Sequence, residues 1–346
     1  PPDPHVAGPP THHPPTAGRV PPDARAVTFN MVWTGRVFDD LQLFTHSLLV
    51  HTRARFRFVA NACPPDQVRN MERFASEHPD RVVGVEVVST DRMVRHGDAL
   101  DDVRRRHDDG DLFAFIDPDI LARAPFLHAL LTELHGAAAV TSGREVWSHH
   151  NVRPAEHPGV NGEYFYDQDG FVFGSPHLAV YRRAALDQTL DRWGVGFSSA
   201  GNESAEVRRR LEEMGRSFLV YDTAKIVNIL LQGDGHLLVH RDDTHLVHIG
   251  GMSHYLAPPL PVPGPDGTIT PQWGEEANWR EWPGMADRYD LAQYASLVLR
   301  AVAAGQTPPA PDTVADHLAD RATIVHESRI EPGRLAGPVR VAEGET

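Results

Sequence analysis

The chain has 346 residues, a formal net charge of −14 and a single cysteine. An acidic chain without a dense basic patch argues against nucleic-acid binding, and one cysteine excludes both a disulfide framework and a cysteine-rich zinc site. No apolar run approaches the ~20 residues that a membrane helix needs, and no signal peptide is visible, so we expect a cytoplasmic protein.

Strand-like and helix-like segments alternate after a proline-rich tail at residues 1–24, which we expect to be disordered. The expected strands are 26–33, 56–61, 81–88, 113–116 and 137–141, and the expected helices are 38–50, 67–77, 97–107 and 126–135. Such alternation predicts an α/β fold in which helices flank a mostly parallel central sheet.

The apolar strand 113–116 ends abruptly in Asp117, Pro118 and Asp119. Proline cannot donate to a ladder, so the strand should stop there. Two carboxylates at the end of a buried strand are costly unless something compensates them, and a cation that prefers oxygen ligands, such as Mg²⁺ or Mn²⁺, is the usual partner. The same three residues also fit an ordinary turn after a strand.

Other polar residues follow the strands that should neighbour this one. Thr34 and Arg36 come after the first strand, and Asn61 ends the second. Ligands of parallel sheets bind beyond the carboxyl ends of the strands. We therefore expect these residues to lie on the same edge as Asp117.

The second half of the chain is less regular. We expect a strand over 178–183, a helix over 203–215, a strand over 217–221, and a helix over 288–304. A late stretch reads His248, Ile249, Gly250 and Gly251, and the glycines let backbone amides approach a diphosphate closely. His248 also fits an ordinary strand end, and His240 and His254 are alternative metal ligands.

Taken in order, these segments resemble a bacterial, metal-dependent glycosyltransferase of the GT-A fold over about residues 25–255. The resemblance rests on a helix and Asp109-Gly110-Asp111 before the Asp-Pro-Asp strand, an acidic helix start at Glu203, and the late His248. The chain contains one lysine, Lys225, and this arginine bias suggests a GC-rich, actinobacterial genome.

The resemblance implies a GT-A-like (Rossmann-like) domain with a nucleotide-sugar-binding half at 25–145 and a less regular, acceptor-binding and catalytic half at 146–256. Residues 257–346 would form a proline- and glycine-rich extension with one helix and a flexible end. The implied reaction moves a sugar from a nucleoside-diphosphate sugar, with UDP the commonest carrier, to the hydroxyl of a small-molecule or glycan acceptor.

The resemblance also implies roles for individual residues. Asp119 would ligate Mn²⁺ or Mg²⁺ directly, Asp117 would ligate it through water or hold the ribose, and His248 would complete the shell. Asp98, together with Gly250 and Gly251, would join Thr34, Arg36 and Asn61 in binding the nucleotide.

Glu203 is the first candidate for a general base, and Asp169 is the second. Ser204 stands where the family usually has an aspartate, which weakens that role for the helix start. A retaining reaction needs no such base, and Glu203 equally fits an acid favoured by a helix dipole.

Two other functions stay open. A nucleotidyltransferase of related fold usually carries a glycine-rich, basic loop after its first strand, and Thr34-Gly35-Arg36 is short for that loop. A non-catalytic carbohydrate-binding protein of the same fold would bind sugar without metal dependence. A metal-dependent hydrolase is disfavoured because the sequence has no His-Glu-x-x-His cluster.

Overall fold

The structure is a computed structural model. It describes residues 23–90, 92–143, 146–147, 170–174, 177–198, 203–217, 221–241, 243–252, 261–263, 269–271 and 284–327. Within these ranges, no helix is both long enough and apolar enough to cross a membrane.

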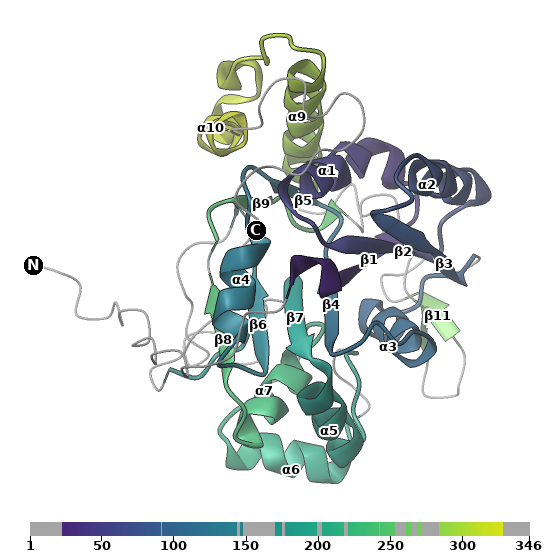
Figure 1. Cartoon of the computed structure of the whole chain (residues 1–346), viewed down its shortest axis with the longest axis vertical. Coiled ribbons are helices and arrows are strands. Elements are labelled where there is room, and N and C mark those ends of the chain that lie inside the picture. The colour runs from purple at the N-terminus through teal and green to yellow at the C-terminus, as the bar shows by residue number, and fades with distance from the viewer. Residues whose placement is uncertain are drawn as a thin grey trace, which may run out of the picture.

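A seven-stranded sheet forms the centre of the molecule, in the order β3-β2-β1-β4-β7-β6-β8 (Figure 1). Every strand runs in the same direction except β7, which is antiparallel to both of its neighbours. The strands are β1 (Thr28–Thr34), β2 (Arg55–Asn61), β3 (Val82–Ser89), β4 (Leu112–Ile116), β6 (Ala139–Ser142), β7 (Leu178–Arg182) and β8 (Leu238–Arg241). The predicted α/β fold with a mostly parallel central sheet is confirmed.

Side chains that alternate along the strands supply two apolar cores, one on each face of the sheet. On β4, for example, Ala114 and Ile116 belong to one core, whereas Phe113 and Phe115 belong to the other. The first core is covered by α1 (Phe38–His51), α2 (Pro65–Glu77) and α4 (Leu127–Leu134). The second is covered by α3 (His96–Arg106), α5 (Arg183–Trp193) and α7 (Lys225–Gly233).

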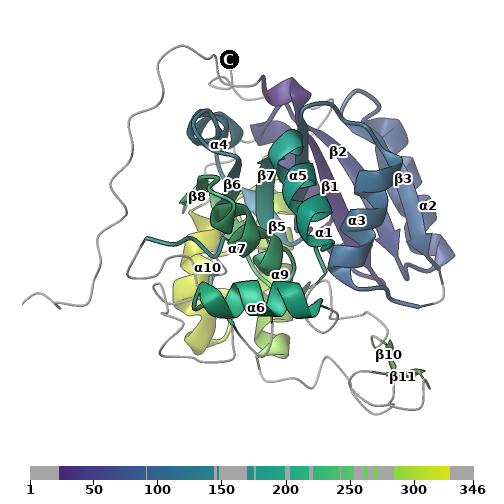
Figure 2. The same ribbon diagram turned by 90° about the horizontal axis from the view of Figure 1, so that it is seen from below.

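Helix α6 (Ala205–Glu213) packs outside α7, where Val207 and Leu211 meet Ile226 and Leu230 in a third apolar cluster (Figure 2). Ser204 caps this helix, because its hydroxyl accepts a hydrogen bond from the Val207 amide at 3.2 Å. The capping interaction explains why serine is suited to the position before the first helical turn.

A short second ladder, β5 (Ile120–Ala122) with β9 (Leu246–His248), lies beside α1. Helix α9 (Met285–Ala303) packs against α1 and shares the first core, and α10 (Ala319–His326) packs against α9 (Figure 1). The smaller elements are the hairpin β10 (Pro261–Pro263) with β11 (Ile269–Pro271) and three 3₁₀ turns, η1 (Ala24–Ala26), η3 (Pro311–Thr313) and η4 (Asp316–Leu318). The expected tail before residue 23, most of the expected strand 217–221 and the end of the chain after residue 327 lie outside the described residues.

Candidate metal and nucleotide site

Asp117 follows β4 directly, at the edge of the sheet where β1 and β2 also end. Thr34 and Asn61 are paired in the register of β1 and β2, which confirms that these predicted residues share one edge. This is the edge at which open α/β sheets bind their ligands.

His177 is placed opposite Asp117 by the antiparallel pairing of β4 with β7. The register pairs Ile116 with Leu178, and the Asp117 amide continues the ladder by donating to the His177 carbonyl at 2.7 Å. Backbone hydrogen bonds therefore fix the separation of a carboxylate and an imidazole that lie 60 residues apart in the sequence.

His248 reaches the same place through the second ladder. β5 pairs antiparallel with β9, and Ile120 is opposite His248. Asp119 immediately precedes β5, so its carboxylate lies beside that histidine, with Oδ1 3.1 Å from Nε2. The two aspartates thus flank the proline, and each has a histidine brought to it by a different pair of strands.

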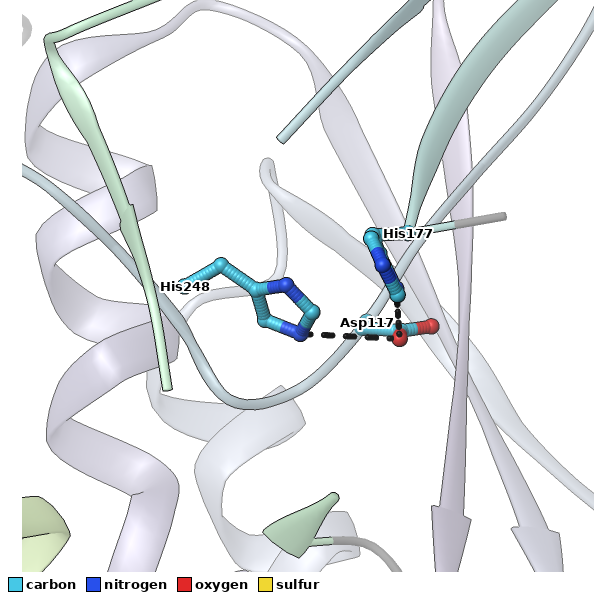
Figure 3. Close-up of side chains that lie close together, drawn as sticks. All are labelled: Asp117, His177 and His248. Atoms are coloured by element: carbon cyan, nitrogen blue, oxygen red, sulfur yellow. Dashed lines mark hydrogen bonds and ion pairs between the residues drawn. The ribbon is translucent and has the colours of Figure 1, made fainter. Parts of the chain in front are cut away.

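Asp117, His177 and His248 converge on one point, and their candidate ligand atoms all lie within 4.8 Å of one another (Figure 3). Asp117 Oδ2 is 3.3 Å from His177 Nδ1 and 3.8 Å from His248 Nε2. The side chain of Asp117 is 21% exposed and that of His248 is 1% exposed, so the cluster is shielded but open at the aspartate.

Burial, aided by neighbouring groups, keeps His177 neutral. Burial lowers its pKa well below 6.5, and the electrostatic effects of His248, Lys225 and His96 lower it further. A neutral imidazole keeps the lone pair that a metal ion binds. His96, at the start of α3, also faces Asp117, with Nε2 3.9 Å from Oδ1.

Asp119 is almost completely buried, yet its environment favours the ionised form. Burial acts to raise the pKa of this carboxyl, but the charge and hydrogen bond of His248 and the Met252 amide together hold it below 3.8. Its two oxygens are occupied by these contacts, with Oδ2 accepting from the Met252 amide at 2.9 Å. Asp119 therefore orients His248 and the loop after it.

The donor set of the cluster fits a divalent transition-metal ion. Ligands on adjacent corners of an octahedral ion, at ~2.0–2.1 Å from it, lie about 3 Å apart. The 3.3 Å between Asp117 and His177 is close to this value, and the 3.8 Å to His248 closes with a small side-chain movement. One carboxylate with two imidazoles suits Mn²⁺ better than Mg²⁺, which prefers oxygen ligands.

The other residues predicted for the nucleotide have clear local roles in the fold. Asn61 is buried and pairs with the backbone of Val94, donating to its carbonyl at 2.8 Å and accepting from its amide at 2.9 Å. Arg36 is exposed and forms an ion pair with Asp66 at 2.8 Å. Asp98 is exposed in the first turn of α3.

Gly250 and Gly251 follow His248 directly and have φ values of 80° and 76°, a left-handed conformation that favours glycine. Of the alternative ligands, His240 lies on β8 and is hydrogen-bonded through Nδ1 to Thr141 at 3.0 Å, and His254 lies outside the described residues. Glu203 is half-buried just before the cap of α6, and Asp169 also lies outside the described residues.

His177, His96 and Lys225 were not among the residues predicted from the sequence. The sequence places His177 just before an expected strand, but it does not give the direction of that strand in the sheet. Only antiparallel pairing with β4 brings His177 to Asp117. Lys225 is fully buried on α7 and donates to the Gly174 carbonyl. The signal available in the sequence was that Lys225 is the single lysine of a chain that otherwise uses arginine.

Comparison with known proteins gives only remote similarity. No family model and no curated protein matches the sequence. Among solved structures, the mannosyltransferase PcManGT of Pyrobaculum calidifontis, in complex with GDP-Man and Mn²⁺, is 12% identical at a TM-score of 0.37, over 91% of this chain and 71% of that one.

Two other glycosyltransferases are similar at the same level. The glycosyltransferase GlyE of Streptococcus pneumoniae TIGR4 is 9% identical at a TM-score of 0.36, over 63% of this chain, and this chain spans only 45% of GlyE. The galactosyltransferase LgtC, in complex with donor and acceptor sugar analogues, is 10% identical at a TM-score of 0.34, over 63% of this chain and 74% of that one. At such TM-scores these similarities carry no argument about the function of this chain.

Proposed function

We propose that the protein is a metal-dependent glycosyltransferase that takes its sugar from a nucleoside-diphosphate donor. The observation that carries the proposal is the convergence of Asp117, His177 and His248 at the carboxyl end of β4. The site also lies where the sequence resembles the metal motif of GT-A enzymes. The assignment made from the sequence changes in one respect: we propose His177 as a ligand beside Asp117 and His248, with Asp119 holding the loop that follows His248.

A bound Mn²⁺ would supply positive charge that stabilises the diphosphate as it leaves the sugar. The chain's own residues prepare the site for that event. Asp117 and the two imidazoles would hold the ion, while Asp119, which accepts from the Met252 amide at 2.9 Å, keeps the loop after His248 in place. Thr34 and Asn61 form the edge on which the nucleoside would lie, and Gly250 and Gly251 offer amides to the phosphates.

In the transfer, the bond between the anomeric carbon and the phosphate oxygen breaks, and the acceptor oxygen forms the new glycosidic bond. The acceptor hydroxyl must lose its proton. For an inverting reaction we propose Glu203 as the base, with Asp169 as the second candidate. UDP as the carrier and a cytoplasmic location remain proposals based on the resemblance.

Calorimetric titration with Mn²⁺ tests the site before any substrate is known. We expect wild type to bind one Mn²⁺, and Mg²⁺ more weakly. Asp117→Asn and His177→Gln each remove a ligand, so each should weaken Mn²⁺ by about 100-fold or more, above the range for residues that only support a ligand. His245→Gln is the matched control, because this histidine is 51% exposed and bonds the Pro125 carbonyl instead.

A second titration with UDP, GDP and dTDP, with and without Mn²⁺, separates the functions. Metal-dependent nucleotide binding followed by cleavage of a sugar nucleotide supports the transferase. Sugar binding that ignores both metal and Asp117→Asn supports the non-catalytic carbohydrate-binding protein, and release of pyrophosphate from a nucleoside triphosphate supports the nucleotidyltransferase. Unchanged Mn²⁺ affinity in both ligand variants refutes the metal site.

A further inference from the structure

The loop that follows His248 is held on one side by Asp119. The Ile249 amide donates to the Asp119 carbonyl at 3.0 Å, and the Met252 amide donates to the Asp119 carboxylate at 2.9 Å. Both ends of the four-residue loop are therefore attached to the residue that also orients His248.

The other side of this loop is held by Arg288, which comes from helix α9. Its Nη1 donates to the Ile249 carbonyl and to the Gly250 carbonyl, each at 2.9 Å. The guanidinium also lies over the Trp147 ring, 5.4 Å from its centre. An arginine held by an aromatic ring and two backbone carbonyls is a rigid clamp, because its planar fork fixes the directions of the hydrogen bonds.

The hydrogen bonds of Arg288 also determine where the N–H groups of Gly250 and Gly251 point. In a planar trans peptide, the N–H points opposite to the C=O of the preceding residue. Because the Ile249 and Gly250 carbonyls face Arg288, the amides of Gly250 and Gly251 face away from it. Neither amide makes a hydrogen bond within the described part of the chain. Successive free amides in a turn are a common form of anion site.

We propose that Arg288 is a positioning residue that holds the Gly250 and Gly251 amides for the diphosphate oxygens next to the metal ion. This inference rests on the proposed function and deepens it. It makes the C-terminal helix α9 part of the donor site, although α9 contributes none of the three ligands. Arg288 acts only through the loop, because its guanidinium is engaged by carbonyls on the side away from the amides.

Arg321 of α10 provides a matched control. Its guanidinium lies over the same Trp147 ring, 4.3 Å from the centre. Arg288→Lys and Arg321→Lys both retain the charge and remove a guanidinium from that ring, but only the first removes the paired hydrogen bonds to the loop. Arg288→Gln is a second variant, which keeps a single amide donor without the charge.

The experiment measures the affinity of inorganic pyrophosphate in the presence of Mn²⁺, the affinity of Mn²⁺ alone, and the melting temperature. We expect Arg288→Lys and Arg288→Gln to weaken pyrophosphate by about tenfold, the size of one ordinary hydrogen bond's contribution. Mn²⁺ affinity should stay within about twofold of wild type, because the ligands are placed by the two ladders. Arg321→Lys should leave both affinities unchanged.

The failures of the two proposals are distinguishable. If wild type binds neither Mn²⁺ nor pyrophosphate, the proposed function is wrong and the role of Arg288 falls with it. If wild type binds both but the Arg288 variants retain full pyrophosphate affinity, only the positioning role is wrong. An equal loss in Arg321→Lys would also overturn that role, since packing around Trp147 would then be the cause.

Discussion

Replacing Asp101 with asparagine tests how strongly burial perturbs one carboxyl group of helix α3. Asp101 is 7% exposed, and its Oδ2 accepts a hydrogen bond from the Phe197 amide at 2.9 Å. Its other oxygen is buried and has no hydrogen-bond partner in the ranges that the structure describes. Burial raises the pKa of Asp101 from 3.8 to about 6, against the opposing effects of the Phe197 amide and Arg104.

A shift of roughly two units corresponds to about 3 kcal/mol. Because the folded-state pKa is raised, the native protein holds this proton more tightly than the unfolded chain does. The stabilisation is therefore complete below the unfolded pKa and is lost as the pH rises through about 6. Roughly half of this stabilisation, ~1.5 kcal/mol, is lost between pH 5 and pH 7.5. The other half is already lost below pH 5, because Asp101 ionises there in the unfolded chain.

Asparagine cannot ionise, so the stability of Asp101→Asn relative to wild type should rise by ~1.5 kcal/mol between these two pH values. Urea unfolding followed by circular dichroism measures the change, and comparing two pH values cancels the constant cost of the new amide. Asp102→Asn is the control, because that side chain is 37% exposed and ion-paired with Arg106 at 2.6 Å. An Asp101→Asn offset that is the same at both pH values would refute the reasoning.

Two further predictions concern other buried positions. Burial and the neighbouring His78 lower the pKa of His46 from 6.5 to about 4, so this histidine costs stability as the pH falls through that window, up to about 3 kcal/mol. His46→Phe should therefore flatten the acid side of the urea-unfolding profile, and an unchanged profile would contradict the assignment. Gly174→Ala should lower the melting temperature, because φ is +69° and a Cβ would lie 2.5 Å from Asn228 Nδ2. The left-handed backbone alone costs ~1–2 kcal/mol even if Asn228 moves aside, so a variant as stable as wild type would refute the prediction.

The sequence predicted the first half of the fold because its signals there are local. Apolar runs and turn residues alternate clearly, and the expected strand 113–116 and helix 97–107 lie within one residue of β4 (Leu112–Ile116) and α3 (His96–Arg106). The expected edge, with Thr34, Asn61 and Asp117 after parallel strands, followed from the same alternation.

Helices α5 and α7 were missed for different physical reasons. All residues from Lys225 to Leu231 are buried, so the polar Lys225 and Asn228 do not mark a solvent-exposed face of α7. Helix α5 begins at Arg183, directly after β7 ends at Arg182, with no turn residue to separate the two elements. In both cases the tertiary structure decides what the local pattern leaves ambiguous.

The candidate site shows the same limit more sharply, because strand pairing assembles it. The Asp-Pro-Asp segment is local and was found, but each histidine depends on a ladder that forms between distant segments. The two ladders are also independent: a change that slips β9 would move His248 and leave His177 opposite Asp117. The position of each histidine therefore depends on the stability of its own ladder. Since Arg288 and Asp119 clamp the loop after His248 from two sides, the β9 half of the site is the half that the C-terminal helices can influence.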